Sequence, residues 1–170
     1  RDPWTTIGYQ KALNLSSYAQ LRHAYLEKKI LKKASKIIVT SPTTEKEFLL
    51  KTNKPIQVIT NGYDVVQVEK KPLDAKFTLV HTGSFLSDRN PFILWKSLKE
   101  LCDENAQFKA SLEIKLVGKV SDEIVKTIES FGLQSNLNLV GYVSHDEVLV
   151  IQKSAQVLLL VEIDAPETRC

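Results

Sequence analysis

The chain has 170 residues, of which 43% are hydrophobic and 25% charged, the ordinary composition of a globular protein with one domain or parts of two. Its formal net charge of +3 lies far below the basic excess of a typical nucleic-acid-binding protein, so we expect no nucleic-acid partner. Two cysteines, with no histidine beside them at metal-ligand spacing, favour a reducing compartment over a disulfide framework.

The first third of the chain predicts two helices and two strands. Apolar residues recur at helical spacing over residues 16–34, and a β-branched run at residues 36–40 predicts a buried strand. Ser41 and Pro42 are typical of the first residues of a helix, which we expect to continue to about residue 52. A second strand at residues 56–60 ends at a turn made by Asn61 and Gly62.

The first helix carries a basic arc opposite its apolar side. The apolar side contains Ala19, Leu26, Ile30, Leu31 and Ala34, and the arc contains Arg22, Lys28, Lys29, Lys32, Lys33 and Lys36. Such an arc is usually a solvated face. Contact with an anionic membrane surface is the alternative, which the sequence favours less because no apolar wedge accompanies the lysines.

Residues 65–76 are polar and predict a linker, after which strands and helices alternate. This spacing predicts βαβ units, and therefore an α/β fold with a Rossmann-like parallel sheet and flanking helices. The predicted strands are residues 77–82, 112–117, 137–140 and 155–161, and the predicted helices are residues 91–103, 122–131 and 146–153.

Three consecutive strands end in glycine. Gly83-Ser84, Gly118-Lys119 and Gly141-Tyr142 follow the first three strands of this second part. Parallel sheets bind ligands beyond the carboxyl ends of their strands, and glycine lets a ligand approach the backbone closely. The pattern fits a ligand-binding rim and a simple set of strand terminators equally well.

The loop after Gly83 suggests an anion site. Asn90 as N-cap and Pro91 as first helical residue predict a helix start immediately after Arg89, and a helix N-terminus favours anions. The Arg89 guanidinium can hold two phosphate oxygens at once. The alternative is that Asp88 and Arg89 form a solvated surface pair.

Three histidines have different expected roles. His145 lies in a predicted capping box between Ser144 and Glu147, and His23 lies on the apolar side of the first helix. His81 precedes Gly83 by two residues and is therefore the histidine closest to the expected ligand edge.

Several segments, in this order, resemble family 4 glycosyltransferases, which have the two-domain GT-B architecture. The similar segments are residues 34–41 and 56–64, the latter with Asn61-Gly62-Tyr63-Asp64, then residues 80–91, 115–118, 139–147 and 154–160. The resemblance implies a piece of a longer protein. Residues 1–64 would end an acceptor-side Rossmann-like domain, residues 65–76 would link the domains, and residues 77–170 would form an incomplete donor-binding domain.

The resemblance also implies the site. A nucleoside-diphosphate sugar would lie against Gly83, Ser84, Arg89, Asn90, Gly118, Lys119, Gly141, Tyr142 and Val143. Family members carry an Arg beside the first glycine and a Lys in the loop that follows. Here Ser84 replaces that Arg and Arg89 stands in the place of the Lys, so one cation remains for the diphosphate.

The implied enzyme transfers a sugar with retention of configuration, uses no metal or other cofactor, and serves polysaccharide or glycoconjugate synthesis. Its acceptor would be a lipid-linked group or a glycan, and it would be cytoplasmic, either free or peripheral on the inner face of the membrane. The catalytic residues would lie outside this stretch, which by itself would be inactive. A noncatalytic nucleotide- or sugar-binding module with the same fold is the alternative.

Overall fold

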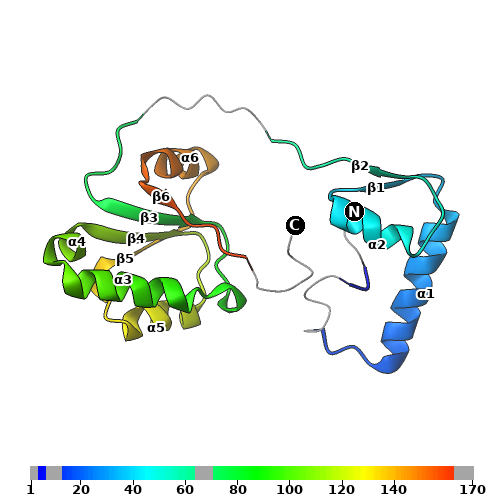
Figure 1. The fold of residues 1–170 in the computed structure, drawn as a ribbon, viewed down its shortest axis with the longest axis horizontal. Coiled ribbons are helices and arrows are strands. Elements are labelled where there is room, and N and C mark those ends of the chain that lie inside the picture. Colours follow the sequence, from blue (N-terminus) through cyan, green and yellow to red (C-terminus); the bar gives the residue numbers. More distant parts are fainter. Residues whose placement is uncertain (1–3, 7–12, 64–70, 163–170) are drawn as a thin grey trace. The chain divides into compact units, whose positions relative to one another are not determined.

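The computed structural model describes residues 4–6, 13–63 and 71–162, which belong to two compact units (Figure 1). The first unit contains the described residues up to Tyr63, and the second contains those from Lys71 onward. Each unit has its own parallel sheet, and the described strands of one unit do not pair with those of the other.

The first unit is a two-stranded parallel sheet with two helices. Ile37 pairs with Ile56 and Val39 with Val58. Ser41 accepts a hydrogen bond from Thr44 N and Pro42 opens the second helix, which confirms the predicted helix start. The elements are α1 (Ser17–Lys33), β1 (Ile37–Val39), α2 (Pro42–Leu49) and β2 (Ile56–Val58).

The helix α1 buries a charged residue that its apolar pattern does not predict. Glu27 is buried beside Leu31, whereas Ile30, which we expected on the buried side, is exposed. The Glu27 carboxylate accepts hydrogen bonds from Trp4 N, Thr5 N, Thr5 Oγ1 and Lys51 Nζ. Burial alone would raise the pKa of Glu27, but the bonds from Thr5 and Lys51 outweigh burial and hold that pKa below its ordinary value.

The second unit is a four-stranded parallel sheet with the order β5-β4-β3-β6. The predicted α/β class, with a parallel sheet and flanking helices, is therefore confirmed. The elements are β3 (Phe77–Thr82), η2 (Ser87–Arg89), α3 (Phe92–Glu104), α4 (Ala106–Ser111), β4 (Leu112–Val117), α5 (Asp122–Ser130), η3 (Gln134–Asn136), β5 (Leu137–Gly141), α6 (His145–Ser154) and β6 (Val157–Leu158).

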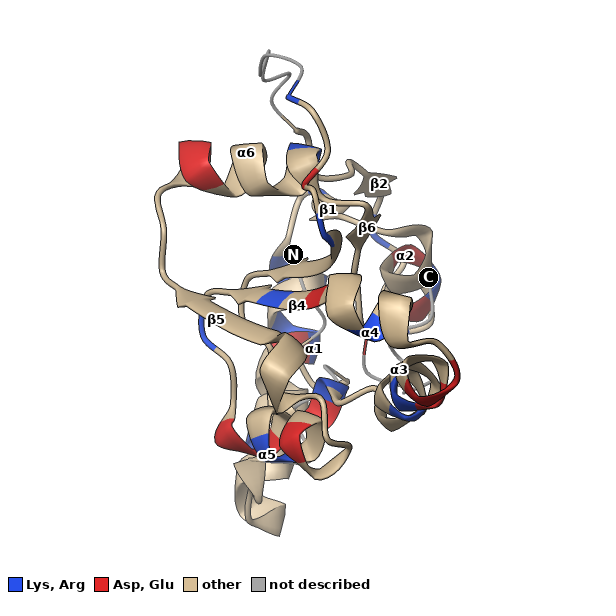
Figure 2. Cartoon of the chain, turned by 90° about the vertical axis from the view of Figure 1, so that its left-hand side faces the viewer, with Lys and Arg blue, Asp and Glu red and all other residues tan. Residues whose placement is uncertain are grey.

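Helices cover both faces of the second sheet. The helices α3, α4 and α5 lie on one face and α6 lies on the other (Figure 1). The first face holds the main core, in which Trp95 from α3 and Ile124 from α5 are fully buried beside Ile114 of β4. Most Lys, Arg, Asp and Glu residues of this unit lie on the helices, as expected when strands are covered on both faces (Figure 2).

Some predicted boundaries were wrong. Helix α2 ends at Leu49 because Lys51 N and Thr52 N both bond to the Phe48 carbonyl, which closes the helix in a tight turn. Helix α4 was missed, although Asn105 caps it by accepting from Phe108 N. Strand β6 has only two residues instead of the seven of residues 155–161.

The predicted linker is only partly described. Residues 65–70 lie outside the described part of the chain. Asp74, near the end of the predicted linker, already belongs to the second unit: Asp74 N bonds to Ser154 O, and Asp74 Oδ2 lies 3.1 Å from both Lys115 Nζ and Thr78 Oγ1. The end of the predicted linker is therefore bonded to the second unit, three residues before β3 begins.

Candidate functional site

The three glycines lie side by side at the carboxyl edge of the second sheet. Strands β5, β4 and β3 are adjacent, so Gly141, Gly118 and Gly83 follow one another along that edge. Gly83 N bonds to Val117 O at 2.8 Å, and Gly118 N bonds to Gly141 O at 2.7 Å. The sheet thus ends in three consecutive turns that are tied to one another through the backbone.

A side chain at Gly118 would collide with the neighbouring turn. Its φ is +109°, and an added Cβ would stand 2.5 Å from the carbonyl oxygen of Gly83. Gly83 has nearly the same φ, +112°, but an added Cβ there would meet nothing within 4 Å. Gly118 is therefore required for close packing of two turns, whereas the surface of Gly83 is open to a ligand.

A buried phenylalanine anchors the loop after β3. Phe85 N donates to Lys119 O at 2.8 Å, and Phe85 O accepts from Ser121 N at 2.9 Å. The Phe85 ring is fully buried and stacks on His81 with ring centroids 4.2 Å apart. The sequence did not lead us to this anchor, although the apolar pair Phe85-Leu86 in an otherwise polar loop was a visible signal.

Arg89 is exposed at the end of η2, and within the described chain it forms no ion pair. Ser84 is exposed as well, one residue after Gly83. The structure leaves the Arg89 guanidinium available to an anion on the loop that Phe85 fixes.

The expected capping role of Asn90 was wrong. Helix α3 begins at Phe92, with Pro91 as the residue before it and no side-chain cap. The Asn90 side chain accepts from Trp95 Nε1 at 2.8 Å and donates to Thr127 Oγ1 at 2.9 Å. Trp95 is fully buried, so the Asn90 amide satisfies the indole N–H instead of capping α3.

The Gly141 turn leads into a capped helix. Tyr142 is exposed and Val143 is half-buried, with Ser144 following as the N-cap of α6. Ser144 and Glu147 form the predicted capping box, which confirms a structural explanation for the segment around His145. Hydrogen bonds from Ser144 lower the pKa of the Glu147 carboxyl.

His81 and Ser121 hold buried polar atoms near the same loop. His81 Nδ1 lies 3.0 Å from Leu159 O, and the ring is almost completely buried. Within the described chain, His81 Nε2 and Ser121 Oγ have no hydrogen-bond partner. His81 therefore lies beneath the loop, behind Phe85, instead of on an open ligand surface.

Among the described residues, no group of three or more His, Cys, Asp and Glu side chains is arranged to hold a metal ion. No described helix is long and apolar enough to cross a membrane.

No protein-family model matches the chain, and no curated protein sequence does. Solved structures do match. The chain is similar to TarM of S. aureus, with a TM-score of 0.61 and 16% identity over 81% of this chain and 27% of TarM. It is also similar to WaaG, "a glycosyltransferase involved in lipopolysaccharide biosynthesis", with a TM-score of 0.59 and 14% identity over 89% of this chain and 46% of WaaG.

A third match is HepE of Anabaena, solved in complex with UDP, with a TM-score of 0.57 and 16% identity over 86% of this chain and 43% of that one. The chain thus spans between about a quarter and a half of these proteins. The matched structures are GT-B glycosyltransferases. This chain has their fold.

Proposed function

We propose that this chain is the donor-binding half and part of the acceptor half of a glycosyltransferase that uses a nucleoside-diphosphate sugar. The observation that carries the proposal is the edge formed by Gly83, Gly118 and Gly141 in a sheet with the GT-B fold. In open parallel sheets this edge is where nucleotides bind. Structures of TarM and HepE contain UDP, which makes UDP the first nucleotide to test.

The donor would lie across the three turns. Gly83, Ser84 and Arg89 would receive the diphosphate, and Gly118, Lys119, Gly141, Tyr142 and Val143 would surround the nucleoside. Asn90 would border the donor and hold the end of the loop in place, because its amide is bonded to Trp95 and Thr127. The exposed Arg89 guanidinium supplies the charge that a departing diphosphate needs, and lost charge stabilisation of this kind commonly costs a transferase much of its rate.

Transfer would proceed with retention of configuration and without a metal ion or other cofactor, in polysaccharide or glycoconjugate synthesis. Arg89 would then perform the charge neutralisation that a divalent cation performs in metal-dependent enzymes. Activity of the natural full-length protein in excess EDTA, with the product anomer read by NMR, tests both statements. Loss of activity in EDTA, restored by Mg²⁺ or Mn²⁺, would contradict the first, and an inverted anomer the second.

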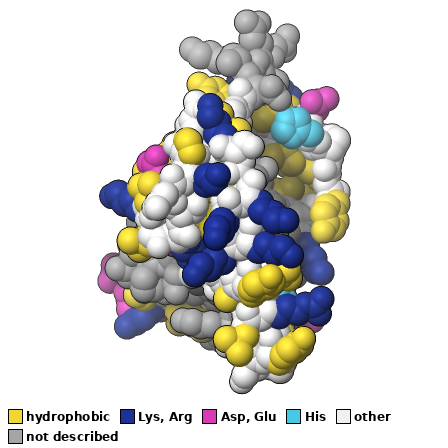
Figure 3. All heavy atoms as spheres, turned by 90° about the vertical axis from the view of Figure 1, so that its right-hand side faces the viewer, with side chains coloured by type: hydrophobic (Ala, Val, Ile, Leu, Met, Phe, Trp, Pro, Cys, Tyr) yellow, Lys and Arg dark blue, Asp and Glu magenta, His cyan; other side chains and the backbone are white. Residues whose placement is uncertain are grey.

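We also propose a lipid-linked or glycan acceptor and a cytoplasmic protein that contacts the membrane through α1. Tyr18, Leu21 and Tyr25 are all exposed on the same side of α1 as its lysines, which supplies the apolar wedge that the sequence alone did not reveal. Figure 3 shows lysines gathered on this face with hydrophobic side chains among them. Aromatic and basic residues on one helix face favour the interface of an anionic bilayer.

If α1 contacts the membrane in this way, binding to anionic vesicles should need its apolar residues as well as its lysines. The natural protein should co-sediment with vesicles containing phosphatidylglycerol, and Leu21→Ser with Tyr25→Ser should weaken binding by roughly tenfold through lost apolar burial. Ile93→Ser, which removes an exposed apolar residue from the second unit, is the matched control and should bind normally. Equal sedimentation of all three proteins would exclude α1 as the contact.

The noncatalytic nucleotide- or sugar-binding module remains the second candidate, since the same edge could bind a nucleotide without transfer. A thermal-shift panel of nucleoside diphosphates and their sugars, followed by a transfer assay, separates the two. Stabilisation by UDP or another nucleoside diphosphate with sugar transfer supports the transferase. Stabilisation without transfer or hydrolysis of any donor supports the module.

A further inference from the structure

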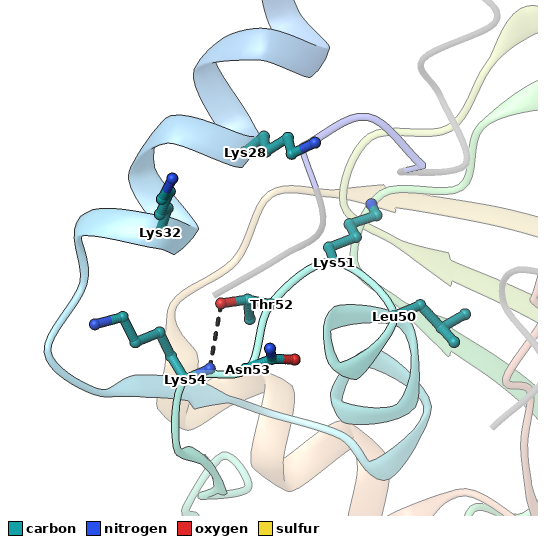
Figure 4. Close-up of a pocket in the computed structure, with 7 residues that line it drawn as sticks. All are labelled: Lys28, Lys32, Leu50, Lys51, Thr52, Asn53 and Lys54. Atoms are coloured by element: carbon teal, nitrogen blue, oxygen red, sulfur yellow. Dashed lines mark hydrogen bonds between the residues drawn. The ribbon is translucent and has the colours of Figure 1, made fainter.

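The first unit contains a lysine-lined pocket near the amino ends of its two strands. The pocket has a volume of about 590 Å³, within the range of small-ligand sites. Lys28 and Lys32 come from α1, and Lys51, Thr52, Asn53 and Lys54 come from the segment between α2 and β2 (Figure 4). Because this segment leads into β2, the pocket lies at the amino ends of the strands. Nucleotides in open parallel sheets bind at the carboxyl ends, so that rule does not predict a site here.

Among the described residues, carboxylates neutralise one of the four lysines. Lys51 Nζ lies 3.1 Å from Glu27 Oε2 and 2.7 Å from Glu47 Oε1. Lys28, Lys32 and Lys54 form no ion pair with any residue that the structure describes. The pocket therefore holds three positive charges that no described carboxylate compensates.

This arrangement costs stability when the pocket is empty. Lys28 and Lys32 are four residues apart on α1, and like charges at this spacing repel each other. Lys32 lies in the last turn, where a cation favours the helix dipole, but Lys28 lies outside it and gains nothing from the dipole. The helix dipole of α1 thus explains a lysine at position 32 alone, whereas a bound anion would explain the positive charges of Lys28, Lys32 and Lys54 together.

We propose that this pocket binds a phosphate group, either of a free phosphate ester or of a phospholipid headgroup. Lysine ammonium groups act as compact point charges toward phosphate oxygens. The exposed amide of Asn53 adds a neutral donor at the same opening. The proposal does not depend on donor binding in the second unit.

The test measures binding of inorganic pyrophosphate, and separately of phosphatidylglycerol vesicles, to the natural full-length protein. Lys28→Gln with Lys54→Gln should weaken binding about tenfold or more in at least one arm, as expected from two lost charge-assisted contacts. Lys46→Gln with Lys76→Gln removes the same charge from exposed positions outside both the pocket and α1, and should change binding in that arm by less than about twofold. The Leu21→Ser and Tyr25→Ser variant should bind pyrophosphate normally, which separates the pocket from the apolar membrane contact.

Weakening by the pocket variant in the pyrophosphate arm identifies a free phosphate ester as the ligand. Weakening in the vesicle arm alone identifies a headgroup if it exceeds the weakening caused by Lys29→Gln with Lys33→Gln, which removes the same charge from α1 outside the pocket. If the pocket variant and the Lys46 and Lys76 variant bind alike in both arms, the lysines are only a solvated face and the proposal is overturned. Circular dichroism of each variant confirms that it is folded.

Discussion

The requirement for glycine differs between Gly83 and Gly118, although the two have nearly the same φ. Gly118→Ala would place a Cβ 2.5 Å from the Gly83 carbonyl, whereas Gly83→Ala would strain only the backbone. We expect Gly83→Ala to lower the free energy of unfolding by about 1–2 kcal/mol, the cost of a left-handed non-glycine residue. Gly118→Ala should cost roughly 1–3 kcal/mol more because the two turns must separate. Urea titrations followed by Trp fluorescence measure both, and equal losses would show that the close approach is unimportant.

The buried Glu27 should make stability depend on pH. Its pKa is lower in the folded than in the unfolded chain, so its contribution is complete above the unfolded value, about 4.3, and is lost as the pH falls through the lower folded value. Glu27→Gln should lower the free energy of unfolding at neutral pH by about 1–3 kcal/mol and reduce the acid slope. The control is Glu45→Gln, whose carboxylate forms no ion pair with a described residue. Urea titrations between about pH 3 and pH 7 measure the slope, and an unchanged slope in Glu27→Gln would contradict the account.

The start of α3 depends on one amide. Asn90→Ala would leave the buried Trp95 indole N–H without its acceptor and Thr127 Oγ1 without its donor. We expect the free energy of unfolding to fall by about 1–3 kcal/mol. The control is Asn138→Ala, which loses one exposed hydrogen bond to Glu113 and should change stability by less than about 0.5 kcal/mol. If chemical denaturation shows the two variants to be equally stable, the Asn90 amide does not stabilise the start of α3.

At the scale of elements, the sequence predicted best where local and tertiary preferences agree. Strands β3 and β4 have the predicted bounds. A glycine follows each apolar run, and each strand lies between two neighbouring strands of the sheet. The Asn90-Pro91 pair was misleading because the indole of Trp95, five residues later, competes for the Asn90 amide. That competition arises from packing between α3 and α5 and has no local signal.

At the scale of the whole molecule, the glycine edge was predictable and the lysine pocket was not. Repeated glycines after alternating strands indicate one sheet edge, since parallel strands end on the same side. Lys28 and Lys32, by contrast, have the pattern of an ordinary solvated face. The fold brings residues 50–54 beside α1, and it pairs Lys51 with Glu27 and Glu47 while no described carboxylate pairs with Lys54.

The central claim is that the carboxyl edge of the second sheet binds a nucleoside diphosphate with the help of Arg89. Calorimetric titration of UDP and the other nucleoside diphosphates into the natural full-length protein tests it most directly. Arg89→Ala removes one charge-assisted phosphate contact of roughly 1.5–3 kcal/mol, so affinity should fall about tenfold to a hundredfold. Arg89→Lys should recover part of that loss because a point charge replaces a two-pronged donor.

The matched control is Lys126→Ala, which removes an exposed cation from α5 in the same unit and should leave the affinity within about twofold. Tenfold or greater weakening in Arg89→Ala, with Lys126→Ala unchanged, is the result we predict. Equal affinity of the natural protein and Arg89→Ala, or no binding of any nucleoside diphosphate, would contradict the proposed donor site.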